Sequence, residues 1–225
     1  MDTYNNIPEI YFFNNNGNPT ITSPNSPYEI SFYQTRETLN NPELYEAFIK
    51  NIISRFHSSE TYTNYKKCLY DWGLDHSQVH GNISSEMASL EMHHNILTIF
   101  DITIIICEHI LNTKGRISSF DIIMLLKKAH MNNTISLIML DITTHQVYHD
   151  NPTFYIDPKQ CILWKFGDFL SEYYSGITKA IAIKILCYFE EAMEKDCTYD
   201  DKLLDLREHI VNWSNYNDVM YYKGA

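Results

Sequence analysis

Two stretches of this sequence carry histidines at spacings that suit metal chemistry. In LEMHHNIL, residues 90–97, His93 and His94 are adjacent, so on a strand their side chains point to opposite faces. In HQVYH, His145 and His149 are four residues apart, so on a helix they share a face and can bind one ion together. A third ligand from His93 gives three protein ligands and open positions for water or substrate, as in catalytic metal centres. His94, on the other face, is then free to act as a base.

The order of these motifs resembles the HNH, or ββα-metal (His-Me finger), endonuclease family. In that family a Glu-x-His-His segment ends the first strand, and a second strand, a turn and a short helix with His-x-x-x-His follow. Here E-M-H-H, the apolar stretch S-L-I-M-L and H-Q-V-Y-H come in the same order. The resemblance implies that His93, His145 and His149 bind one divalent metal ion and that His94 is the general base that activates water. It also implies that DNA is the substrate, and it does not choose among Mg, Mn, Ni and Zn.

The chain departs from the family's pattern at two places. The position of the family's central asparagine falls near Ser136, so His130, Asn133 and Ser136 are the candidates for supporting the base. Asp141 and Thr144 stand where zinc-bearing members of the family have two cysteines, so no second, structural zinc is expected. The geometry of the base therefore depends on which of the three candidates orients it.

Periodicity and end signals predict the elements that must position these residues. Short strands are predicted at SLEMHH, residues 89–94, and at ISLIML, residues 135–140, with a short helix after the second strand. Helices are predicted over residues 41–56, 58–74, 95–115, 118–133, 177–195 and 200–216. Two of them lie between the strands. The chain is therefore predicted to be α+β and predominantly helical, with a small ββα-metal module that carries a long helical insertion.

Composition along the chain predicts three parts. Residues 1–42 are rich in Asn, Pro, Ser and Thr, which predicts an irregular N-terminal arm. Residues 43–190 are expected to form the HNH-like core with its helical insertion, and residues 191–225 a C-terminal helix and tail.

Charge and cysteine usage limit the function classes. The formal net charge of -11 disfavours a broad basic surface for nucleic acid, because affinity for phosphates comes largely from Lys and Arg. The five cysteines are scattered and form no C-x-x-C pair, which indicates reduced thiols. There is no signal-peptide pattern, and the longest apolar run is too short to span a bilayer. A soluble, intracellular protein without a membrane partner is expected, in the host cytoplasm if a phage encodes it.

Three functions stay open at this point. The first is a metal-dependent endonuclease of phage or mobile-element type, to which a protein partner delivers DNA because the chain is acidic. The second is a catalytically degenerate module that serves as a binding or assembly subunit, for example of a phage. The third is a metal-dependent hydrolase of a smaller phosphoester, which needs no basic groove. The oligomeric state is not determined by the sequence.

Overall fold

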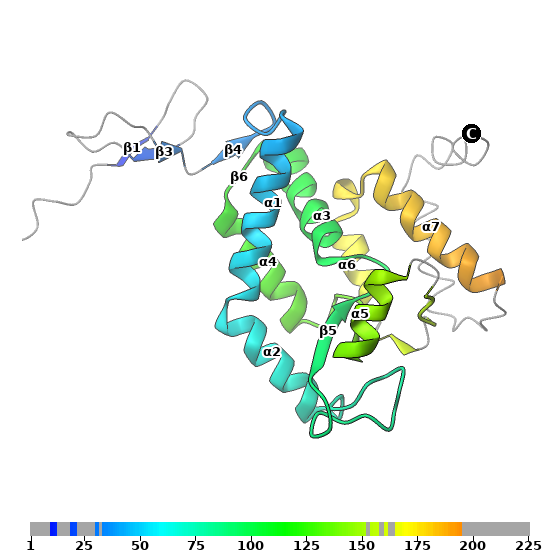
Figure 1. Cartoon of the computed structure of the whole chain (residues 1–225). Helices are drawn as coiled ribbons and strands as arrows, with labels where there is room; N and C mark the ends of the chain where they lie inside the picture. Colours follow the sequence, from blue (N-terminus) through cyan, green and yellow to red (C-terminus); the bar gives the residue numbers. More distant parts are fainter. Residues whose placement is uncertain are drawn as a thin grey trace, which may run out of the picture.

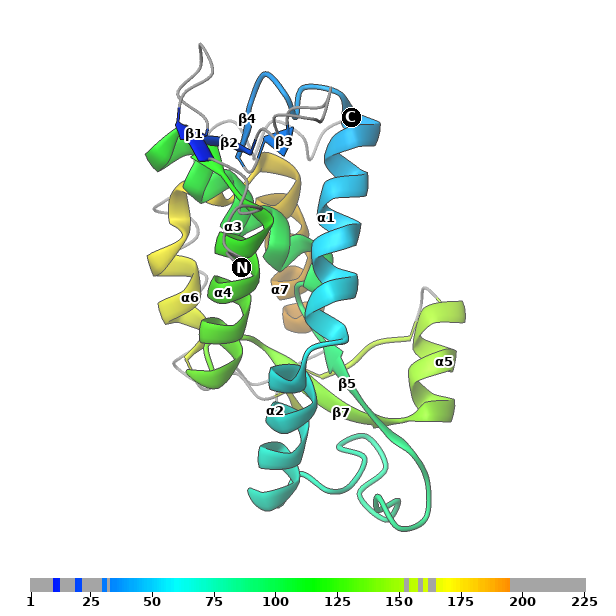
Figure 2. The same ribbon diagram turned by 90° about the vertical axis from the view of Figure 1, so that its left-hand side faces the viewer.

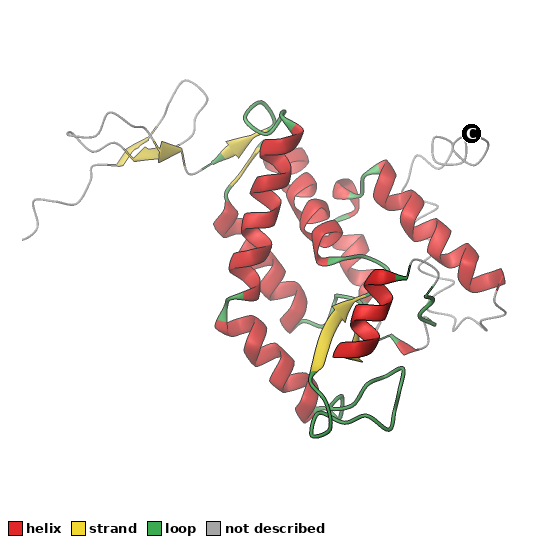
Figure 3. Ribbon diagram, viewed as in Figure 1, coloured by secondary structure: helices red, strands yellow, loops and turns green. Residues whose placement is uncertain are grey.

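Helices dominate the structure, and strands occur only in small sheets (Figure 3). The computed structural model describes residues 10–12, 19–21, 30–31, 33–151, 154–157, 160–161 and 165–194. The prediction of a predominantly helical α+β chain is confirmed for these residues. The predicted helix over 200–216 and the tail lie outside them. None of the described helices is long and apolar enough to cross a bilayer.

Short strands form in the described part of the N-terminal segment. Strands β1 (Ile10–Phe12), β2 (Pro19–Ile21) and β3 (Ile30–Ser31) make an antiparallel sheet. Strand β4 (Gln34–Thr35) pairs antiparallel with β6 (Arg116–Ile117), so backbone hydrogen bonds join this segment to the helical core.

Three long helices lie side by side and bury the largest part of the core (Figures 1 and 2). They are α1 (Pro42–His57), α3 (Ile99–Lys114) and α4 (Ser119–Met131). Helix α3 is apolar around much of its circumference, which explains its central place between its neighbours. Helices α6 (Phe166–Glu172) and α7 (Lys179–Glu194) and the short helix η2 (Tyr174–Gly176) complete the described helical part.

Helix α3 begins later than predicted. The predicted helix starts at residue 95, whereas Ile96 has a φ of 69°, a conformation that no helix interior accepts. The helix starts only after Thr98, whose side chain forms a capping box with Asp101. Its predicted end is confirmed, because Gly115 closes the helix in the left-handed conformation at φ 72°.

A two-stranded sheet and one short helix lie at the end of the helical core (Figure 2). Strand β5 (Leu90–His94) pairs antiparallel with β7 (Leu137–Asp141), and helices α3 and α4 lie between them in sequence, as predicted. Helix α5 (Ile142–Asp150) follows β7 directly, with Asp141 as its N-cap.

Helix α2 (Glu60–Asp71) covers one face of this sheet. On that face its buried side chains pack against alternate residues of both strands: Tyr65 and Leu69 meet Leu90, Met92, Leu137 and Met139. The intervening residues of β7 pack on the other side with Ile156. Both faces of β7 are therefore buried, which explains its continuous apolar sequence.

Candidate metal centre

The two adjacent histidines at the end of β5 serve opposite faces of the sheet. His94 has the same parity as Leu90 and Met92, which face α2, so its ring lies on that side. His93 points to the face that carries α5, where its ring lies 5.0 Å from that of His145 and 5.3 Å from that of His149, centroid to centroid. The period of a strand thus separates the two rings.

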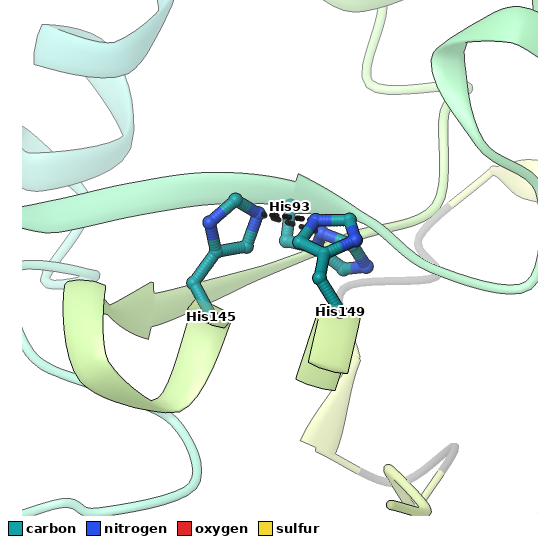
Figure 4. Close-up of side chains that lie close together, drawn as sticks. All are labelled: His93, His145 and His149. Atoms are coloured by element: carbon teal, nitrogen blue, oxygen red, sulfur yellow. Dashed lines mark hydrogen bonds between the residues drawn. The ribbon is translucent and has the colours of Figure 1, made fainter. Parts of the chain in front are cut away.

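The structure brings His93, His145 and His149 together (Figure 4). One ring comes from β5, and the other two come from successive turns of α5. Nε2 of His145 lies 3.1 Å from Nδ1 of His93 and 3.1 Å from Nε2 of His149. Two nitrogens bound to one tetrahedral ion at 2.0–2.1 Å lie about 3.3 Å apart, so these spacings suit a shared ion.

Glu91 decides which nitrogen His145 can offer. Its carboxylate faces Nδ1 of His145, so Nδ1 carries the proton and Nε2 keeps a lone pair. Without an ion, that single lone pair would have to accept hydrogen bonds from both neighbouring rings. An ion at the centre removes the conflict, because all three rings then direct a lone pair towards it. A carboxylate behind a ligand histidine is also the usual second layer of a metal site.

Burial favours the neutral imidazole of His93 and of His145, and the neutral form is the one that binds metal. It lowers the pKa of His93 to about 4, and the neighbouring charges of His145 and His149 add to the shift. It also lowers the pKa of His145, against the opposing effect of the Glu91 carboxylate. At neutral pH the lone pairs of both rings are therefore available.

His94 contacts His130, one of the three candidate supporting residues. Nε2 of His94 lies 2.9 Å from Nε2 of His130, and both side chains are buried. The other two candidates lie elsewhere: Asn133 accepts a hydrogen bond from the Tyr65 hydroxyl at 3.0 Å, and Oγ of Ser136 is buried without a hydrogen-bond partner among the described residues.

Asp141 and Thr144, at the family's two cysteine positions, bond to each other. Asp141 accepts from the Thr144 hydroxyl at 2.7 Å and from its backbone N–H at 3.0 Å, and it also accepts from Ser77 at 2.9 Å. Burial acts to raise the pKa of the Asp141 carboxyl, but these hydrogen bonds outweigh it and lower that pKa. The network fixes the start of α5, and thus His145, by hydrogen bonds alone.

A cavity of about 460 Å³ opens beside these groups. Residues from both faces of β5 line it, with the three clustered histidines on one face and His94 on the other. Lys66 of α2 is the only lysine or arginine among the described residues that line it, and it donates to the Leu90 carbonyl at 2.5 Å.

The sequence motifs assign no role to Glu91, and they place Lys66 only in a candidate cationic patch, with solvated helix faces as the alternative. Glu91 has a signal that could have identified it, since it lies two residues before His93 and therefore on the same face of the strand. Lys66 has no such local sequence signal, because its approach to β5 depends on how α2 packs on the sheet.

Acid is expected to destabilise the fold through His130. A histidine in the unfolded chain has a pKa near 6.5, whereas burial lowers the pKa of His130 to about 4. Between these values the unfolded chain binds a proton that the folded chain does not, so the free energy of unfolding falls as the pH decreases. The loss is about 1.4 kcal/mol per pH unit and roughly 3 kcal/mol in total, and the contribution is complete above about pH 6.5.

Urea unfolding at a series of pH values, with a chelator present, measures this loss without metal release. The variant His130→Phe should show a shallower dependence on pH than the wild type, while His80→Gln, in an exposed loop, should not. Equal slopes for His130→Phe and the wild type would contradict the assignment.

Comparison with known proteins gives one family. A family model described as Bacteriophage G278-like virion protein matches residues 4–217. No curated protein and no solved structure matches the chain. The family's description names a virion protein and no enzymatic activity. Because the match covers nearly the whole sequence, the chain belongs to the bacteriophage G278-like virion protein family.

Proposed function

We propose that this protein is a phage virion-associated subunit that binds a divalent metal ion and hydrolyses phosphodiester bonds of DNA. The virion role is supported by the family to which the chain belongs. The hydrolytic role is supported by a single observation: three clustered imidazoles and a fourth, hydrogen-bonded imidazole line one cavity. The strand, strand and helix that carry these groups follow one another as in the ββα-metal nucleases that the sequence resembles.

The residues divide the chemistry as follows. His93, His145 and His149 hold the ion, which when bound stabilises the charge on the scissile phosphate and the leaving oxygen. His94 accepts a proton from the attacking water as the water oxygen bonds to phosphorus. The bond from phosphorus to the leaving oxygen breaks, its electron pair goes to that oxygen, and the oxygen takes a proton from solvent.

Charge determines how DNA reaches the cavity. Lys66 can contact a phosphate near the ion, since its ammonium group retains hydrogens beyond the one given to Leu90. The chain as a whole carries a formal net charge of -11, which opposes free association with DNA. The proposal is therefore that neighbouring virion proteins bring the DNA to the site, and that this chain supplies little of the affinity.

Nicking of supercoiled plasmid tests the hydrolytic role. The purified protein is incubated with Mg, Mn, Ni or Zn, beside His94→Ala and the control His80→Ala, whose side chain lies outside the cavity. The wild type and the control are expected to nick the plasmid, and His94→Ala to be slower by about 10²- to 10⁴-fold. No cleavage with any metal would sink the nuclease hypothesis, and cleavage of a small phosphodiester alone would replace DNA by a smaller substrate.

A second function is favoured by the family and by the acidic charge. Here the protein is a binding or assembly subunit of the virion, and the ion serves only to hold α5 against β5. This version expects one bound ion per chain, loss of thermal stability on chelation, and no cleavage. The plasmid assay and a metal analysis of the same sample separate the two functions.

A further inference from the structure

The hydrogen bonds around His130 define the protonation of its ring. Nδ1 of His130 lies 2.7 Å from the Leu126 carbonyl oxygen, which can only accept, so Nδ1 carries a proton. The ring is fully buried against Phe56 and Tyr65, at centroid distances of 4.6 and 5.4 Å. Burial there favours the neutral imidazole, whose Nε2 then has a lone pair and no proton.

The state of His94 follows from that of His130. Nε2 of His130 can only accept, so Nε2 of His94, 2.9 Å away, must donate. A neutral imidazole has one proton, and in His94 it is therefore on Nε2. Nδ1 keeps its lone pair, and the ring that carries it lines the cavity with the three clustered histidines.

We propose that His130 is a positioning residue that fixes the ring and the tautomer of His94, so that Nδ1 of His94 is the atom that accepts the proton of water. The proposal rests on the hydrolytic function proposed above. His130 acts through His94 and does not line the cavity itself. His130 takes the supporting role that an asparagine has in the ββα-metal pattern. It belongs to α4, one of the two helices between β5 and β7 in sequence.

Neither of the other candidates can replace it. The Asn133 side-chain oxygen is engaged by Tyr65, and Ser136 has no hydrogen bond to His94. The hydrogen bonds that run from the Leu126 carbonyl through His130 to His94 permit only one tautomer of His94.

Three substitutions at position 130 separate positioning from packing. His130→Gln keeps an acceptor at the place of Nε2, His130→Asn keeps a polar amide that is too short to reach His94, and His130→Phe keeps only the ring. All three are measured for thermal stability, bound zinc and plasmid nicking in the full-length protein. His130→Gln is expected to keep most of kcat, whereas the other two lose about 10- to 100-fold with KM and zinc content unchanged.

Nitrogen-15 NMR of the histidine rings in the zinc-loaded protein reads the tautomers directly. In the wild type we expect the proton of His94 on Nε2 and that of His130 on Nδ1, with His94→Gln used for assignment. His130→Asn and His130→Phe should lose the single tautomer of His94, and His130→Gln should keep it. A proton on Nδ1 of His94 in the wild type overturns the proposal, and so does equal kcat in all three variants.

The two measurements also separate this proposal from the proposed function. If the wild type cleaves nothing, the hydrolytic function fails whatever the tautomer is. If it cleaves but His94 has its proton on Nδ1, the function stands and the role of His130 fails.

Discussion

Replacing His145 by alanine is expected to abolish stoichiometric metal binding. Its Nε2 lies 3.1 Å from a nitrogen of each of the other two rings, so its loss removes the central ligand of the three. Isothermal titration with zinc measures the affinity, and a thermal melt measures the linked stability. At a zinc concentration 100-fold above its Kd, the wild type should gain about 2.7 kcal/mol, and His145→Ala should gain none.

Two further variants are expected to affect zinc affinity less than His145→Ala does. Glu91→Gln removes the carboxylate charge that fixes the tautomer of His145 but leaves the ligand in place, so zinc affinity should fall by about 10- to 100-fold. His94→Ala should bind zinc like the wild type, because its ring lies on the other face of β5. Equal loss of zinc in His94→Ala and His145→Ala would contradict the division of roles between the two faces.

The local elements of this fold could be predicted because their signals are local. The alternation in LEMHH, the β-branched stretch before Asp141 and the capping residue Ser118 act within a few residues of the structure they produce. The i, i+4 spacing of His145 and His149 on a helix is of the same kind. The predicted start of α3 was wrong because the apolar periodicity continues through Ile96, where the backbone leaves the right-handed helical region.

The contacts that complete the site could not be predicted in this way. His130 is 36 residues from His94 in sequence, and it reaches that ring because α4 packs beside α1 behind the sheet. The sequence could name His130 as a candidate beside Asn133 and Ser136, but only the packing distinguishes among them. Lys66 likewise reaches the cavity through the packing of α2 on the sheet.

The family match concerns the role of the whole chain, whereas the histidine cluster concerns the chemistry of one cavity. The family match extends over residues 4–217 and so concerns the whole chain, which it relates to virion proteins. The histidine cluster concerns one cavity, which His93, His94, His145 and His149 line and in which His93 and His94 are buried. Under the proposed nuclease function, the formal net charge of -11 would leave the delivery of DNA to other virion subunits.

Replacing Gly176 by alanine is expected to cause the largest loss of stability among single methyl additions at described glycines. A Cβ at this position would lie 1.9 Å from the carbonyl oxygen of Ile105 and 2.7 Å from the amide nitrogen of His109. Both atoms belong to the backbone of α3, so a side-chain rotation cannot relieve the overlap. Either η2 or the central helix has to move, at a cost of about 3 kcal/mol.

Urea unfolding of Gly176→Ala beside Gly81→Ala measures this cost against a matched control. Gly81 has open space around it, since no heavy atom lies within 4 Å of an added Cβ, and the same chemical change there should alter the free energy of unfolding by less than about 0.5 kcal/mol. Because α3 follows directly on the strand that carries His93 and His94, Gly176→Ala should also weaken zinc binding if the helix moves. If η2 moves instead, stability falls and zinc affinity does not. Equal stability of the two alanine variants would refute the close packing of η2 on α3.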